Sequence, residues 1–137
     1  QNAKYLMIIL TKIATMPYNE KLADRVREII SLTETNVTEK KMFGGLCFMV
    51  EDKMCVGVEE ERLMVRINPA FMAEAMEKDG CQPMDHSGKV MKGFVFLDLN
   101  VVNTNKKLDY WIQLALAYNK IARPAKRKKK KKSIRIK

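Results

Sequence analysis

The spacing of apolar residues near the start of the chain predicts an amphipathic helix. Leu22, Val26, Ile29 and Ile30 recur at steps of three or four residues and would form one apolar stripe. Asn19 precedes them as a favourable N-cap residue. The charged residues between these positions would face solvent, so this helix should pack one side against a core.

Five strands are predicted after this helix, because apolar segments with strand periodicity alternate with turn residues. The first two strands flank the polar sequence Glu51-Asp52-Lys53 and should form a hairpin. The third alternates apolar Leu63, Val65 and Ile67 with residues that would point to the other face. The strands are expected at residues 46–50, 54–58 and 62–67, near 81–84 and at 90–99.

Two registers are open for the hairpin, and they place the cysteines differently. With Glu51 and Asp52 as a two-residue turn, Cys55 lies opposite Phe48 and faces away from Cys47. With a three-residue loop, Cys47 and Cys55 become diagonal neighbours on one face. Both registers are compatible with the sequence.

Two further helices complete the predicted order. Asn68 and Pro69 are typical of a helix start. Asn103 or Thr104 should cap a last helix that runs through Ile121. This helix is apolar around much of its circumference, which indicates deep packing or contact with a partner subunit. Its apolar residues are Leu108, Trp111, Ile112, Leu114, Ala115, Leu116, Ala117 and Tyr118.

The resulting order is α-β-β-β-α-β-β-α. Strands that follow one another directly in the sequence favour an antiparallel sheet over a doubly wound parallel one. We therefore expect an α+β fold with two layers, in which helices pack on an antiparallel sheet.

The charge of the chain is concentrated at its C-terminal end. The 137 residues include 26 Lys or Arg and 16 Asp or Glu, a net charge of +10. Ten of the basic residues and no acidic residue follow position 122, so residues 1–122 hold 16 of each sign. Such a tail should be disordered, and it could bind nucleic acid through phosphates without sequence preference. The candidate nucleic-acid residues are Lys126, Arg127, Lys128, Lys129, Lys130, Lys131 and Lys132.

Composition also suggests the domain limits and the compartment. Residues 1–15 are interpreted as a leader ahead of a natural start at Met16, residues 16–122 as one domain, and residues 123–137 as the disordered basic tail. Three cysteines without close pairs favour a reducing, cytoplasmic location. The longest apolar run near the N-terminus is far shorter than the roughly 20 residues needed to span a bilayer, so we expect no membrane association.

Motifs of known chemistry are sparse in this sequence. Met42-Phe43-Gly44-Gly45 fits neither a phosphate-binding nor a dinucleotide-binding loop, and a tight turn or bulge is the simpler interpretation. His86 is the only histidine, and its neighbours in one turn cannot form a catalytic triad. We therefore expect no catalytic residue, cofactor or metal. A small-ligand site that uses Lys41, Arg66 and Lys92 around the glycine pair is a minor alternative.

Methionine is unusually frequent, with ten residues. Methionines fill irregular gaps in cores and also form adaptable binding surfaces. Their positions in predicted strands and helices favour the core-filling role here.

Two segments resemble a known family. They are Lys41-Met42-Phe43-Gly44-Gly45, which leads into the first predicted strand, and Met91-Lys92-Gly93-Phe94. With residues 16–122 around them, they are similar to the TfoX N-terminal domain family. Hairpins of that family often turn on Asn-Gly, where this chain has Glu51-Asp52.

The resemblance implies a function in regulation. It implies an α+β fold similar to secretion-chaperone domains, which often dimerise, and it supplies no catalytic residues. Full-length relatives are implicated in transcriptional control of DNA-uptake genes. We expect a non-enzymatic bacterial regulatory or adaptor domain that acts by protein–protein contacts, as a homodimer, with the transcription machinery as a candidate partner. The alternative is a protein held non-specifically on nucleic acid by its lysine tail. The candidate interaction residues are Lys41, Met42, Phe43, Gly44, Gly45, Met91, Lys92 and Gly93.

Overall fold

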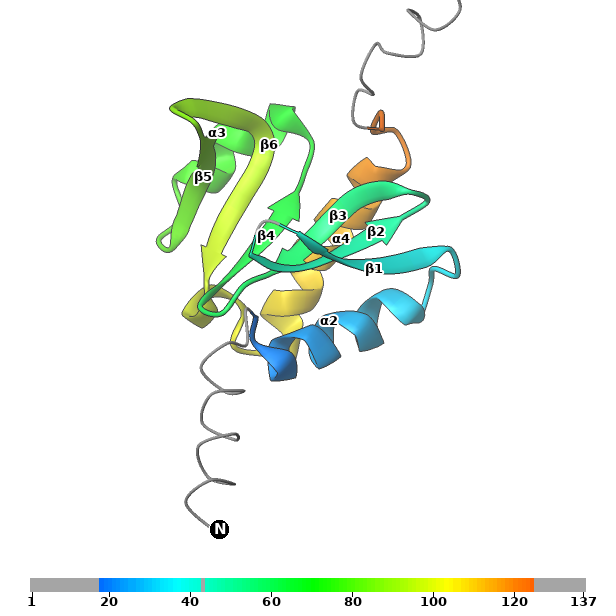
Figure 1. Ribbon diagram of the computed structural model, residues 1–137. Coiled ribbons are helices and arrows are strands. Elements are labelled where there is room, and N and C mark those ends of the chain that lie inside the picture. Colours follow the sequence, from blue (N-terminus) through cyan, green and yellow to red (C-terminus); the bar gives the residue numbers. More distant parts are fainter. Residues whose placement is uncertain (1–17, 43, 125–137) are drawn as a thin grey trace, which may run out of the picture.

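The computed structural model describes residues 18–42 and 44–124, which form a six-stranded antiparallel sheet with helices on one face (Figure 1). The strand order is β1-β2-β3-β4-β6-β5. The strands are β1 (Val37–Met42), β2 (Gly45–Val50), β3 (Lys53–Val58), β4 (Arg62–Arg66), β5 (Cys81–His86) and β6 (Lys89–Asp98). The helices are α2 (Glu20–Ser31), α3 (Met72–Met76) and α4 (Asn105–Asn119), with 3-10 turns at Pro69–Phe71 and Leu99–Val102.

The α+β class and the expected order of elements are confirmed, and the structure adds the strand β1. This strand carries the polar sequence VTEKKM and lies at one edge of the sheet, paired only with β2. Its middle four residues are exposed. An edge strand with few buried side chains has no apolar periodicity, which is why sequence patterning did not reveal it.

Side-chain caps start the helices as the sequence indicates. The Asn19 Oδ1 accepts a hydrogen bond of 3.0 Å from the Leu22 amide at the start of α2. Of the two candidates for α4, Thr104 is the cap, and its hydroxyl accepts from the Lys107 amide at 3.1 Å. Asn68 and Pro69 start a 3-10 turn that continues into α3. α4 ends at Asn119, two residues before the expected end.

The main core lies between the sheet and the helices. The helices contribute Leu22, Ala23, Val26 and Ile30 from α2 and Leu108, Trp111, Ile112, Ala115 and Leu116 from α4, and the strands contribute residues such as Phe48, Val56, Leu63, Val65, Val95 and Leu97. Packing into this core accounts for the breadth of the apolar surface of α4. Tyr110 is the one large apolar residue of that helix that is strongly exposed.

The β2–β3 hairpin adopts the two-residue turn. Glu51 and Asp52 both have positive φ, at 52° and 62°, as a tight hairpin turn requires. A register shift next to Phe48 then brings this residue opposite Val56 rather than Cys55. Cys55 and Val56 both join the main core as a result.

The turn of this hairpin is attached to the C-terminal end of α4. Asn119 is buried, and its Nδ2 donates to the carbonyl of Val50 at 3.1 Å. The Lys53 ammonium donates to the carbonyls of Asn119 and Ala122. The Asn119 carbonyl lies at the end of α4, where a helix leaves carbonyl groups without an internal partner, and Lys53 supplies that partner.

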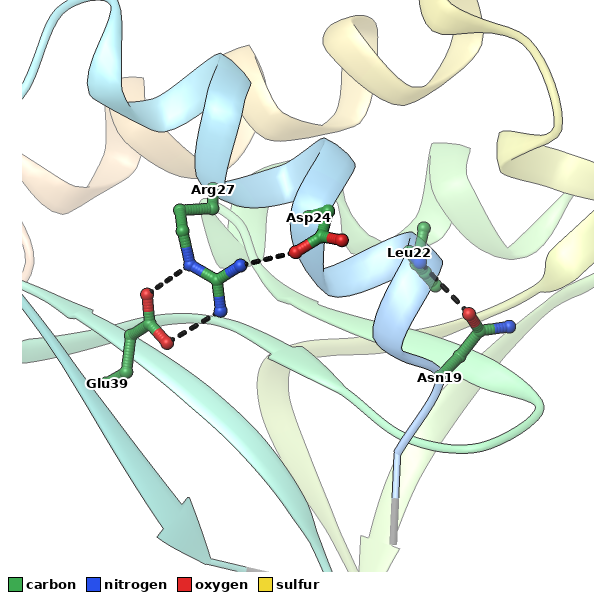
Figure 2. A network of polar contacts seen from close by, with 5 residues as sticks. All are labelled: Asn19, Leu22, Asp24, Arg27 and Glu39. Atoms are coloured by element: carbon green, nitrogen blue, oxygen red, sulfur yellow. Dashed lines mark hydrogen bonds and ion pairs between the residues drawn. The ribbon is translucent and has the colours of Figure 1, made fainter. Parts of the chain in front are cut away.

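A charged network joins α2 to β1 (Figure 2). The Arg27 guanidinium donates to both Glu39 carboxylate oxygens, at 2.6 and 2.8 Å, and to Asp24 at 2.7 Å. The hydrogen bonds from Arg27 lower the pKa of Glu39, and the same contacts raise the pKa of Arg27. The network fixes the edge strand against the helix layer.

Candidate interaction surface

The two faces of the sheet differ in chemistry. Aliphatic side chains face the helices, whereas methionines gather on the opposite face. We call this second surface the methionine face, and none of the described helices contributes to its buried cluster. It comprises Met42, Met49, Met54, Met64, Met84, Met91, Phe94 and Phe96.

The side chains at the centre of the methionine face are buried, and those at its border are partly exposed. Met64, Met84 and Phe96 are 3%, 6% and 8% exposed, although they lie on the side away from the helices. Met54 and Met91 pack against this centre and are half-buried. The sheet is strongly twisted between β3 and β6 (Figure 1). Met42 of β1, Met64 of β4 and Met84 of β5 line one hollow on this face.

The structure brings together methionines from both motif segments. Met42 lines a small hollow with Met64 and Met84, and Met91 packs against the buried cluster to which these two residues belong. Lys41 is exposed and pairs with Leu46, a core residue, so its side chain projects from the helix-covered face. Lys92 is exposed as well. Of the predicted interaction residues, Met42 and Met91 are thus the ones that share a surface, while Phe43 lies outside the described residues.

The motif glycines have conformational roles. Gly44 has a φ of +73° in the turn between β1 and β2. A Cβ on Gly45 would lie 2.3 Å from the Val58 carbonyl oxygen, and one on Gly93 would lie 2.7 Å from that of Ile67. The prediction of a tight turn is confirmed at the glycine pair, and the structure adds the close backbone approach at Gly45.

Two arginines from β4 stack on aromatic rings beside the methionine face. The Arg62 guanidinium lies 3.5 Å from the centre of the Phe96 ring and pairs with Glu59 at 2.7 Å. Arg66 lies 5.3 Å from the Phe94 ring and donates to the Arg123 carbonyl at 3.1 Å. These stacks pack both guanidinium groups against aromatic rings of the methionine face.

A hollow next to the glycine pair is lined by residues other than the three cations of the small-ligand alternative. It is lined by Gly44, the acidic residues Glu59, Glu60 and Glu61, and Arg62. The cation that lines this hollow is Arg62, whereas Lys41, Arg66 and Lys92 are not among its lining residues.

The cysteines are poorly suited to nucleophilic chemistry. All three are free and buried. Burial raises the pKa of Cys47 to about 11 and that of Cys55 to about 12, and it also raises the pKa of Cys81. Because the thiolate is the reactive form, a raised pKa makes each thiol less reactive.

Only some of the remaining predictions concern residues that the structure describes. Within residues 18–42 and 44–124, no group of three His, Cys, Asp or Glu side chains is arranged to hold a metal ion. The side chain of His86, the leader at 1–15 and the basic tail from Lys126 to Lys132 lie outside the described part of the chain. None of the described helices is long and apolar enough to cross a membrane.

Sequence patterning missed several residues that build the methionine face. Met84, Phe94 and Phe96 join it through the pairing of β6 with β4 and β5. A signal was present in β4, where Met64 alternates with core residues and must point away from the helices.

The comparisons with known proteins agree with the motif resemblance. The model of the TfoX N-terminal domain family matches residues 31–118, more than half of the chain and including both motif segments. No curated protein and no solved structure gave a match. The match and the motifs together show that the chain belongs to the TfoX N-terminal domain family.

Proposed function

We propose that this chain is a non-enzymatic regulatory domain that acts by binding another protein through the methionine face. The observation that carries the proposal is the gathering of six methionines on one sheet face, whose buried cluster contains no residue of the described helices. Membership of the TfoX N-terminal domain family supports a regulatory role. The resemblance makes the transcription machinery of a bacterial cytoplasm the first class of partner to test.

Methionine side chains suit a surface that must fit another protein. The unbranched thioether has three rotatable bonds and a polarisable sulfur, so it adapts its shape to an apolar partner. Met64 and Met84 form a closed base, while Met42, Met49, Met54 and Met91 are half-exposed around it. A partner could therefore bury the border without disturbing the main core, which lies on the other side of the sheet.

Site-specific photocrosslinking tests this proposal. Met49, and in a second variant Met91, is replaced by p-benzoylphenylalanine in living bacterial cells. Gln113, which is exposed on α4, carries the same group as a control. We expect a discrete adduct from positions 49 and 91 and none from position 113, with the captured protein identified by mass spectrometry. An adduct of twice the chain mass would identify a second copy, the homodimer expected from the resemblance.

Two charge substitutions test whether the crosslink depends on the methionine face. Met54→Lys and Met91→Lys place a charge at the border of the face and should each remove the adduct at position 49, while circular dichroism shows a retained fold. Equal crosslinking from position 113, or none from positions 49 and 91, would contradict the proposal.

A second candidate function follows from the charge distribution. The ten cations after residue 122 support non-specific binding to nucleic acid. Fluorescence anisotropy with duplex DNA should show salt-sensitive binding by the full chain and none by a chain that ends at Ala122. Binding that survives truncation would contradict a role for the tail.

A further inference from the structure

A pocket on the helix-covered side of the molecule lies away from the methionine face. It has a volume of about 170 Å³ and lies between α4 and the segment that contains the 3-10 turn and α3. Its inner part is formed by core residues, including Ile67, Ala75 and Trp111. None of its lining residues belongs to either family motif, and the proposed protein contact does not use it.

The size and lining of the pocket fit one aromatic ring. An apolar cavity of about 150 Å³ is enough to hold benzene. Phe71, Tyr110 and Trp111 supply three aromatic side chains, and the last two are in edge-to-face contact with ring centres 5.3 Å apart. Phe71 and Tyr110 are 46% and 48% exposed, so two of the five strongly exposed large apolar residues in the described chain border one pocket.

The same pocket also carries one charge of each sign. Glu74 and Lys78 contribute to its lining, and both are exposed. Among the described residues, neither takes part in an ion pair. A carboxylate and an ammonium group are therefore available to a ligand that occupies the pocket.

We propose that this pocket binds a small zwitterionic aromatic compound, of which a free aromatic amino acid is the simplest example. The ligand's ring fills the apolar space between Phe71, Tyr110 and Trp111. Its ammonium group pairs with Glu74 and its carboxylate pairs with Lys78. Tight and specific binding requires both parts of the ligand. The ring contributes buried apolar area, and the two charged groups distinguish this compound from other aromatic compounds.

The intrinsic fluorescence of Trp111 provides the test. Trp111 is the only tryptophan in the chain and lines the pocket, so its emission should respond to a bound ligand. The full chain is titrated with L-phenylalanine, which does not absorb where tryptophan is excited. Phenethylamine lacks the carboxylate and phenylacetate lacks the ammonium group. We expect saturable binding of L-phenylalanine, about threefold to tenfold tighter than that of either analogue.

Substitutions of Glu74 and Lys78 test which charged group of the ligand each side chain contacts. Glu74→Gln should weaken L-phenylalanine and phenethylamine about threefold or more and leave phenylacetate unchanged. Lys78→Met should weaken L-phenylalanine and phenylacetate instead. Glu77→Gln and Lys106→Met change exposed charges outside the pocket and serve as matched controls that should bind normally.

The possible outcomes separate the parts of the proposal. Equal affinity for the three compounds would overturn the roles of Glu74 and Lys78. No fluorescence response to any of them, with the fold intact by circular dichroism, would overturn the site itself. Neither result would bear on the methionine face, whose crosslinking test is independent.

Discussion

At the scale of single residues, close backbone approach explains the glycine pair in the first motif. Gly44 needs its left-handed conformation, and space for a side chain is open around it. Gly45 lies at the start of β2, directly against the backbone of β3. Two adjacent glycines therefore serve different physical purposes, which predicts that they respond differently to the same substitution.

Alanine at each position tests this difference. Gly45→Ala places a Cβ 2.3 Å from a backbone oxygen that cannot move alone, so the free energy of unfolding should fall by about 2–3 kcal/mol. Gly44→Ala meets no atom and should lose only about 1 kcal/mol, the cost of its left-handed backbone. Urea unfolding of both variants measures the two values. An equal or smaller loss for Gly45→Ala would contradict the close approach.

At the scale of elements, the edge strand β1 depends on its neighbours for its position. It pairs with β2 along its whole length, and its exposed side chains contribute little burial. The Arg27–Glu39 contact adds an attachment to α2 (Figure 2). Both side chains are partly exposed, so the contact should contribute modestly to stability.

The pH dependence of stability tests this contact. The hydrogen bond from Arg27 lowers the pKa of Glu39 in the folded state. The contribution of this contact to the free energy of unfolding is therefore fully present above the ordinary pKa of a glutamate. It is lost as the pH falls through the lowered folded-state pKa. Glu39→Gln should therefore reduce the free energy of unfolding by about 0.5–1 kcal/mol at pH 7, and this difference should disappear in strong acid. Denaturant unfolding at both pH values provides the measurement, with Glu28→Gln on the exposed side of α2 as control. A difference that persists in strong acid would exclude the charged contact as its cause.

At the scale of the whole molecule, the sheet separates two apolar regions. The aliphatic core lies between the sheet and the helices, and the methionine face, which we propose as the contact surface, lies on the other side. The cysteines are divided between the two sides, since Cys55 and Cys81 lie in the main core and Cys47 lies beside Met64 and Gly57. All three thiols are buried, so their reactivity should report the integrity of the whole domain.

Alkylation with iodoacetamide at pH 8 tests this protection. Burial raises the pKa of Cys47 to about 11 and that of Cys55 to about 12, so at this pH native Cys47 holds about a hundredfold less thiolate than an exposed cysteine, and native Cys55 holds even less. Both should therefore react at least about a hundredfold more slowly in the native chain than in denaturant. Cys81, whose pKa is also raised, should be slowed in the same direction. Mass spectrometry of the intact chain and of its peptides follows each site. A cysteine that reacts at the rate of the unfolded chain would show that its region opens locally.

Local signals in the sequence identified most of the fold. Asn19 was identified as a cap because a cap acts on a backbone only a few positions away. The sequence left Asn103 or Thr104 as the second cap and two registers for the hairpin, and the structure selects Thr104 and the two-residue turn at Glu51 and Asp52. The polar edge strand β1 had no such signal. Met42 and Met91 were singled out by motif, but nothing local indicated that they would share a surface.

The sequence by itself determined the α+β class, the helix starts and the family, because capping, periodicity and motifs are properties of neighbouring residues. Only the tertiary structure decided which sheet face the helices cover, since alternation divides side chains between two faces without saying which is buried. The tertiary structure also determined which residues form the methionine face and which residues line the aromatic pocket. The methionine face requires the pairing of β4 with β6, and the aromatic pocket requires α3 to lie beside α4. These contacts join residues far apart in the chain, and the packing of the complete domain selects them.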